Sequence, residues 1–318
     1  MPASQGSNLD VVINATGQVS SSAKFSYDAP VISSISSAST STAGTYPLTI
    51  VGINLGQDIV NCSVTVGGAN CPVTSTNHTQ LLCTTPAGIG ANRDVIVTVG
   101  GRQHSGATRT FSYGAPVVST VTSAACVAAG GGSVTDCPIF SGSRPFVTIT
   151  GQNFGTSAPS VTVTIGGLSC DSVGIVTAHT SIQCTLPNNA AGGFGLPIAV
   201  TVQSQSGSNN LLSYRGPFIF ANTLRFSAPV LPGLGAISLN LTSNPDPTAV
   251  NVSFIGQNLG ASPVITYGPS GSPTALSCNS AVATGSPNQT VTCTLSQGAG
   301  TGLQFQAVVG VQTSSPSV

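Results

Sequence analysis

Apolar and polar residues alternate with a period of two through most of this chain. The pattern recurs in three sets of segments at similar spacing: Leu48/Ile50, Val147/Ile149 and Val252/Phe254; Val64–Val66, Val163–Ile165 and Ile265–Tyr267; Val95/Val97/Val99, Ile198/Val200/Val202 and Phe305/Ala307/Val309. Alternation of this kind is typical of a strand with one buried face. The pattern predicts an all-β chain built from repeated units.

A five-residue turn follows the first strand of each set. Its three copies are Gly52-Ile53-Asn54-Leu55-Gly56, Gly151-Gln152-Asn153-Phe154-Gly155 and Gly256-Gln257-Asn258-Leu259-Gly260. Glycine and asparagine tolerate positive φ, so these segments can bend sharply between strands. A repeat of this length indicates tandem domains.

Two cysteines occupy equivalent places in each unit. They follow a Gly-Gly or Gly-Pro turn and are Cys71 and Cys83, Cys170 and Cys184, and Cys278 and Cys293. Two units then end in similar motifs, Phe111-Ser-Tyr-Gly-Ala-Pro116 and Arg225-Phe-Ser-Ala-Pro229. A third copy, Phe25-Ser-Tyr-Asp-Ala-Pro30, appears near the start of the chain.

This order of motifs resembles the IPT/TIG family of immunoglobulin-like domains along almost the whole chain. The resemblance implies a seven-stranded β-sandwich per repeat, arranged end to end, and no enzymatic activity. It also implies that the two repeat cysteines bond to each other, which gives the pairs Cys71–Cys83, Cys170–Cys184 and Cys278–Cys293.

The Ala-Pro junctions set the expected domain boundaries. Residues 1–28 are expected to be the terminal strands of a preceding repeat. Residues 29–115, 116–228 and 229–318 are expected to be three repeats, the last without its final strand.

The middle repeat carries extra residues around Cys126 and Cys137, which we pair, and a second insertion from Leu211 to Asn222. The aromatic residues of the second insertion form either an interface or one more core strand: Tyr214, Phe218 and Phe220.

The ends of the chain allow two interpretations. The truncated repeats fit a fragment of a longer repeat protein, which we favour. The alternative is that neighbouring copies complete each other by strand addition.

Composition narrows the class of protein. Only 4% of the residues are charged, against about 25% in ordinary soluble proteins, and Lys24 is the only lysine. A surface with so little charge is prone to association, so glycans are the expected source of solubility. The acceptor pattern Asn-x-Ser/Thr occurs at Asn14, Asn61, Asn77, Asn240, Asn251 and Asn288. Asn251 is expected to point outward, because Val252 and Phe254 point inward.

Nine cysteines, six of them at repeat-matched positions, indicate an oxidising compartment, and hence secretion. Cys62 has no partner in the repeat pattern. Three alternatives remain open for it: a buried free thiol, a bond to another chain, or displacement of Cys71 or Cys83 from their pairing.

Ionisable chemistry is scarce. The chain has three histidines and seven aspartates but no glutamate, and it contains no nucleophile or phosphate-loop motif. His78 and His179 align as repeat residues, and the aspartates are too scattered to nominate a calcium site. We therefore expect no catalytic residue, no metal site and no cofactor other than covalent N-glycans and O-glycans. Equal numbers of basic and acidic residues disfavour nucleic acid, and no apolar stretch is long enough to span a membrane.

Three functions compete. The leading hypothesis is a secreted, glycosylated structural repeat protein that self-associates into an extracellular fibre, stalk or surface hair. The alternative is the ectodomain of a cell-surface adhesin or receptor that binds a protein or glycan ligand. The third is an accessory domain of a polysaccharide enzyme, which requires a catalytic domain elsewhere in the gene.

Overall fold

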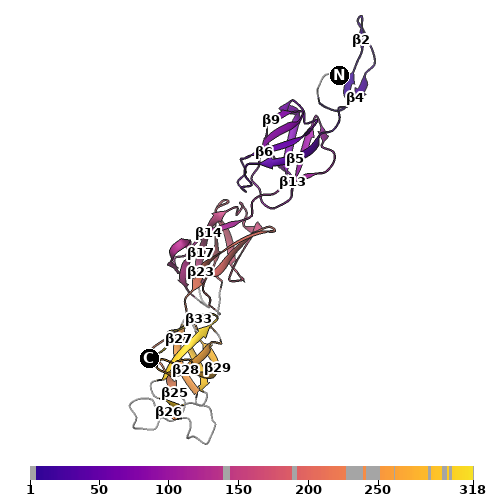
Figure 1. The fold of residues 1–318 in the computed structure, drawn as a ribbon. Helices are drawn as coiled ribbons and strands as arrows, with labels where there is room; N and C mark the ends of the chain where they lie inside the picture. Colours follow the sequence, from indigo (N-terminus) through magenta and orange to yellow (C-terminus); the bar gives the residue numbers. More distant parts are fainter. Residues whose placement is uncertain are drawn as a thin grey trace.

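The computed structural model is all-β, with three sandwich domains that follow one another end to end (Figure 1). It describes residues 5–138, 144–187, 192–226, 239–240, 251–260, 262–285, 288–295, 299–300 and 303–317. Helical structure within these residues consists of three short 3₁₀ turns, η1 (Ile59–Asn61), η2 (Gly130–Gly132) and η3 (Ala158–Ser160). The predicted fold class is confirmed.

Domain 1 packs two antiparallel sheets face to face. The first sheet has the order β5 (Val31–Ser37), β6 (Pro47–Ile53), β10 (Gln80–Thr84) and β9 (Val73–Asn77). The second has the order β12 (Arg102–Gln103), β11 (Arg93–Val99), β7 (Cys62–Val66) and β8 (Ala69–Asn70), and β13 (Arg109–Phe111) also pairs with β11.

Domain 2 repeats this plan and adds two strands. Its first sheet has the order β14 (Val117–Thr122), β17 (Phe146–Gln152), β21 (Ser181–Thr185) and β20 (Asp171–Thr177). Its second sheet has the order β15 (Val127–Ala128), β16 (Val134–Cys137), β23 (Gln205–Tyr214), β22 (Leu196–Val202), β18 (Val161–Ile165) and β19 (Leu168–Ser169). The added β16 pairs in parallel with β23 and so covers an edge of the sheet.

Domain 3 links its two layers through a long strand. Its strands run in the order β24 (Phe218–Ile219), β27 (Asn251–Gln257), β30 (Gln289–Leu295), β29 (Leu276–Thr284), β28 (Val264–Pro269), β32 (Leu303–Val309) and β33 (Gln312–Thr313). The two-residue β25 (Arg225–Phe226) also pairs with β27. The remaining pair is β26 (Leu239–Asn240) with β31 (Ala299–Gly300).

Each domain has its own hydrophobic core, formed by the residues that the alternation placed inward. Leu48 and Ile50, Val147 and Ile149, and Val252 and Phe254 are all buried in the corresponding cores. Because each core is closed within one sandwich, contacts between domains are confined to the sandwich ends.

Residues 5–28 form a hairpin next to domain 1. β1 (Leu9–Val11) pairs with β4 (Ala23–Phe25), and the short β2 (Asn14–Ala15) pairs with β3 (Gln18–Val19) at its tip. Phe25 and Tyr27 meet edge to face, with ring centroids 5.1 Å apart, as Phe111 and Tyr113 do at 5.0 Å. The hairpin thus has the geometry of the last two strands of a repeat.

The predicted boundary between the second and third repeats, at residues 228 and 229, is wrong. β24 and β25 both lie before it, yet both pair with β27 of domain 3. The supposed insertion from Leu211 is the end of β23, so Tyr214 belongs to the core of domain 2, whereas Phe218 and Phe220 contact each other in domain 3. The boundary is the Gly216–Pro217 junction. Residues 227–229 of the misread motif lie outside the described residues.

The last repeat also differs from expectation. Its predicted penultimate strand, β32, is followed by β33, which pairs with it through Val308 and Thr313. This hairpin matches that of β11 and β12, in which Thr98 pairs with Gln103. Domain 3 therefore contains the beginning of its final strand.

Candidate functional site: the junctions between domains

The repeated turn asparagine holds the peptide that enters its own domain. Asn54, Asn153 and Asn258 all have positive φ, at 58°, 65° and 57°. Their side-chain Nδ2 atoms donate hydrogen bonds to Ala29 O, Ala115 O and Gly216 O, at 3.4, 3.0 and 3.2 Å. Each acceptor immediately precedes a proline, which fixes the backbone further. The asparagine is therefore a junction residue as well as a turn residue.

A buried tyrosine ends domains 1 and 2. Tyr113 Oη donates to Pro86 O at 2.9 Å, and Tyr214 Oη donates to Pro187 O at 2.8 Å. Burial raises the pKa of both phenols above their ordinary value, since it disfavours the phenolate. Each tyrosine is thus fixed at both ends, by its ring in the core and by its backbone at the junction.

A glutamine from the following domain caps each of these tyrosines. Gln205 and Gln312 begin the strand after the last hairpin turn of domains 2 and 3. Gln205 Nε2 donates to Tyr113 O at 2.8 Å, and Gln312 Nε2 donates to Tyr214 O at 2.7 Å. Gln312 Oε1 also accepts from Gly193 N at 2.9 Å. The two junctions therefore repeat the same interdomain hydrogen bond.

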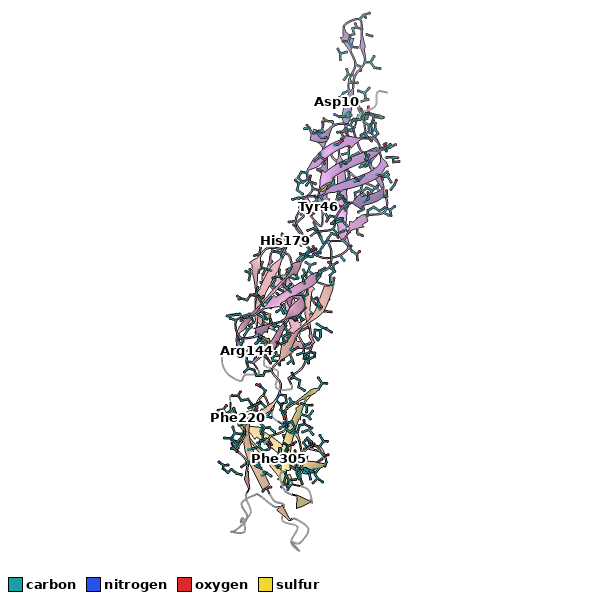
Figure 2. All side chains as sticks on the ribbon, turned by 60° about the vertical axis from the view of Figure 1, so that its left-hand side comes forward. Asp10, Tyr46, Arg144, His179, Phe220 and Phe305 are labelled. Carbon is teal, nitrogen blue, oxygen red and sulfur yellow. A yellow bond between two sulfur atoms is a disulfide. The ribbon has the colours of Figure 1, made fainter. Side chains whose placement is uncertain are left out.

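The junction between domains 1 and 2 contains further hydrogen bonds, which Thr42 makes. Thr42, in the loop between β5 and β6, is only 1% exposed. Its backbone N donates to Asn153 Oδ1 at 3.2 Å, and its Oγ1 lies 3.0 Å from His179 Nδ1, in the turn between β20 and β21 (Figure 2). These three residues join the facing ends of the two domains.

An apolar contact completes this junction. Ile89 of domain 1 packs against the core of domain 2. A Cβ placed on Gly155 would lie 2.7 Å from Ile89 Cγ2, and Gly155 has a φ of 75°. Glycine at the end of the five-residue turn is thus required by both backbone conformation and the neighbouring domain.

The hairpin of residues 5–28 joins domain 1 directly after its five-residue turn. Gln5 Oε1 accepts from Gln57 N at 3.0 Å, and Gln5 Nε2 donates to Asp58 O at 3.3 Å. Tyr27 N donates to Gly6 O, as Tyr113 N does to Gly90 O and Tyr214 N to Gly193 O. The hairpin thus repeats the backbone bond that Tyr113 and Tyr214 make within their own domains, and Gln5 supplies its hydrogen bonds to domain 1.

Comparison with known proteins identifies the repeats. The model of the IPT/TIG domain matches residues 30–113 and 139–215, together half of the chain. The chain belongs to the IPT/TIG domain family. The predicted family is thereby confirmed, and the second match ends where the structure ends domain 2.

Among relatives, human Fibrocystin-L is 25% identical over 201 residues, which are 61% of this chain and 4% of that protein. The chain therefore spans only a small part of the length of this relative.

Solved structures with similar folds have low identity and low TM-scores. A surface glycan-binding protein from Prevotella bryantii is 16% identical with a TM-score of 0.37, covering 71% of this chain and 53% of its own. Domains A168–A170 of titin are 12% identical with a TM-score of 0.28, covering 91% and 96%. The extracellular region of plexin A4 is 17% identical with a TM-score of 0.25, covering 87% and 22%. These likenesses concern the fold alone.

The sequons of the IPT/TIG repeats lie mostly on exposed turns and outer strand positions. Asn14, Asn61, Asn77, Asn251 and Asn288 are exposed, and the side chain of Asn240 lies outside the described residues. Asn77 and Asn288 occupy the same turn in domains 1 and 3, and Asn251 points outward from β27 as expected. Glycosylation at all six remains a prediction.

The disulfides of the structure are the four pairs named from the sequence. Their Cα–Cα distances are 5.5 Å for Cys71–Cys83, 4.3 Å for Cys126–Cys137, 5.7 Å for Cys170–Cys184 and 5.5 Å for Cys278–Cys293. Cys71–Cys83 and Cys170–Cys184 each tie the edge of the second sheet to the first sheet, and Cys278–Cys293 links the neighbouring strands β29 and β30. Cys126–Cys137 ties the added β16 to the loop before β15.

In the structure Cys62 is a buried free thiol, and the bond between Cys71 and Cys83 excludes its displacing either of them, whereas a bond from Cys62 to another chain stays a prediction. It is 9% exposed, and its Sγ lies 3.5 Å from Leu55 O. Burial raises the pKa of this thiol above its ordinary value, so the reactive thiolate is disfavoured.

Ionisable side chains stay dispersed in the described part of the chain. No three His, Cys, Asp or Glu side chains gather there in a group that could hold a metal ion. His104 is buried in a hairpin, where its Nδ1 accepts from Val97 N at 3.2 Å. Asp246, one of the seven scattered aspartates, lies outside the described residues. The same part of the chain holds no helix able to cross a membrane.

The junction roles of Gln205, Gln312 and Thr42 were not predicted from the sequence. A signal was present for the glutamines, since both follow an alternating strand by three residues. Domain 1 has Arg102 at this position, which hid the repeat.

Proposed function

We propose that this protein is an extracellular, N-glycosylated structural rod whose IPT/TIG domains stack end to end into a fibre, stalk or surface hair. The observation that carries the proposal is the repetition of the junction. Gln205 bonds Tyr113 O and Gln312 bonds Tyr214 O, so the two junctions share one interdomain contact.

Most of the hydrogen bonds at these junctions join neutral groups, and one, from the Arg93 guanidinium to Gln203 Oε1 across the first junction, involves a charged side chain. A hydrogen bond of this kind contributes about 1 kcal/mol, and more than one acts at each junction; the first junction adds the packing of Ile89. A linker of one Ala-Pro or Gly-Pro step leaves little freedom between domains. Repeated heterologous contacts that do not close produce filaments rather than rings.

Sugars on the exposed asparagines serve in place of charges. Only two ion pairs occur among the described residues, Lys24–Asp10 and Arg144–Asp171. Sheet edges in most proteins are protected by charged side chains. Glycans on turns and outer strands supply hydration and block lateral pairing of the sandwiches.

Electron microscopy of material secreted from a eukaryotic host tests this proposal. Straight rods of constant width, with lengths that extend by end-to-end addition at high concentration, are the expected result. Compact particles, or domains at random angles, contradict the rod. The receptor or adhesin alternative requires a saturable ligand, and a binding isotherm with a purified protein or glycan would favour it.

A further inference from the structure

A groove lies on domain 2 at the end that faces domain 3. It has a volume of about 550 Å³ and is lined by Thr122, Ser123, Ala124, Ala125, Pro145, Phe146, Thr148 and Gln183. Phe146 is 53% exposed, and hydroxyl and amide groups of the other lining residues flank it. The lining has no ionisable side chain. An open aromatic face with neutral polar neighbours suits an uncharged ligand with many hydroxyl groups, such as a saccharide.

Two hydrogen bonds place the groove at this end of the domain. Leu186 N donates to Pro145 O at 2.8 Å, and the next residue, Pro187, accepts from Tyr214 at the base of the domain. Figure 2 shows Arg144, the neighbour of Pro145, at the end of domain 2 that points to Phe220 of domain 3.

Asn288 lies at the matching end of domain 3. Its Oδ1 accepts from Gln257 Nε2 at 2.8 Å, and Gln257 pairs with Phe218, two residues after Gly216. The asparagine is exposed, and its oxygen is held by Gln257. The nitrogen, the atom that carries a sugar, belongs to the same exposed amide.

The junction of domains 1 and 2 shows how the equivalent regions of those two domains meet. There the loop after the first strand, at Thr42, touches the turn at His179, with 3.0 Å between the two side chains. The groove is lined by the equivalent loop of domain 2, and Asn288 lies in the equivalent turn of domain 3. The glutamine–tyrosine bond is the same at both junctions, and this shared bond is the ground for placing Asn288 opposite the groove.

We propose that the sugar residues nearest Asn288 occupy this groove and stack on Phe146, so that the N-glycan of domain 3 braces its junction with domain 2. The inference rests on the proposed glycosylation. A tethered ligand has an effective concentration in the millimolar range, so a shallow groove with weak intrinsic affinity is filled. Such a brace takes the place that Thr42 and His179 hold at the first junction.

Hydroxyl-radical footprinting of the full chain, secreted from a eukaryotic host, tests the inference. The oxidation rate of Phe146 is compared in the native sequence, in Asn288→Gln and in Asn77→Gln, the matched sequon in the same turn of domain 1. We expect Asn288→Gln to raise the rate at least about twofold, because a mostly filled groove is emptied. Asn77→Gln is expected to leave it unchanged.

A second variant reads the contact from the sugar side. Phe146→Ser is expected to speed enzymatic release of the glycan at Asn288, whereas Val176→Ser, an exposed residue of the same sheet, leaves the release rate unchanged. Glycopeptide mass spectrometry of the same samples separates the two proposals. An occupied Asn288 with equal Phe146 oxidation in all three chains overturns the brace alone. An unmodified Asn288 overturns both the brace and the glycosylation on which it rests.

Discussion

At the scale of single residues, the turn asparagine combines a backbone and a side-chain role. Positive φ costs most residues about 1–2 kcal/mol, and asparagine less. Asn153 also bonds Ala115 O and Thr42 N across the first junction. The five-residue turn therefore repeats because it joins domains, as well as because it bends the chain.

Substitution of Asn153 separates these roles. Asn153→Gly keeps the positive φ and loses both hydrogen bonds, so it is expected to lower the stability of domain 2 little and to expose the 114–116 linker to protease. Asn153→Ala loses both features and is expected to cost about 1–2 kcal/mol more. Urea unfolding with limited proteolysis checks this, and equal behaviour of the two variants would contradict it.

One buried thiol and two buried phenols make the free energy of unfolding depend on pH in the alkaline range. Burial raises the pKa values of Cys62, Tyr113 and Tyr214 above their ordinary values of 9.0, 10.0 and 10.0. Above pH 9 the unfolded chain releases these protons before the folded chain does, so the free energy of unfolding is expected to fall from there upward. Urea midpoints between pH 7 and 11 measure the effect. Cys62→Ala with Tyr113→Phe should flatten the curve of domain 1, and an unchanged slope would refute the assignment.

At the scale of elements, the strands and the disulfides could be predicted from the sequence, but the boundary between domains 2 and 3 could not. Alternation is a local property, so Val147, Ile149 and their equivalents were placed correctly from the sequence. The end of domain 2 depends on the bond from Tyr214 to Pro187 and on the clamp from Asn258 to Gly216, which join residues far apart in sequence. The true end of domain 2 has Leu212 and Gly216 where the repeated Phe-Ser-Tyr-x-Ala-Pro motif has phenylalanine and alanine. The later segment with Phe226 and Ala228 keeps both residue types, so it was taken for the motif.

The four disulfides are expected to differ in effect. Cys71→Ser with Cys83→Ser removes a bond between the sheets of domain 1 and should cost about 3 kcal/mol of its stability. Cys126→Ser with Cys137→Ser releases only β16, so it should raise amide hydrogen exchange along the outer edge of β23 and leave the domain 2 core protected. Exchange mass spectrometry distinguishes the two, and global loss of protection in the second variant would show that β16 is integral to the fold.

At the scale of the whole molecule, the question is how rigid the junctions make the chain. Gln312 bonds both Tyr214 O and Gly193 N, whereas exposed Gln103 on β12 gives a matched control away from these junctions. Gln312→Ala is expected to widen the range of angles that domains 2 and 3 adopt relative to each other, without changing the stability of either domain. Small-angle scattering should show a lower maximum dimension for this variant and no change for Gln103→Ala. Identical profiles would mean that the linker alone sets the angle.

Salt provides a separate check on how the rod is held together. The two ion pairs of the described residues lie away from the glutamine–tyrosine bonds, one within the hairpin and one between Arg144 and Asp171 of domain 2. Screening acts on charges, and the Debye length falls from about 10 Å at 0.1 M to about 3 Å at 1 M. Because the repeated junction bonds are neutral, the maximum dimension is expected to stay constant over this range. A rod that bends or shortens at high salt would show that charges, rather than the amide and carbonyl groups of Gln205 and Gln312 with their tyrosines, fix the orientation of the domains.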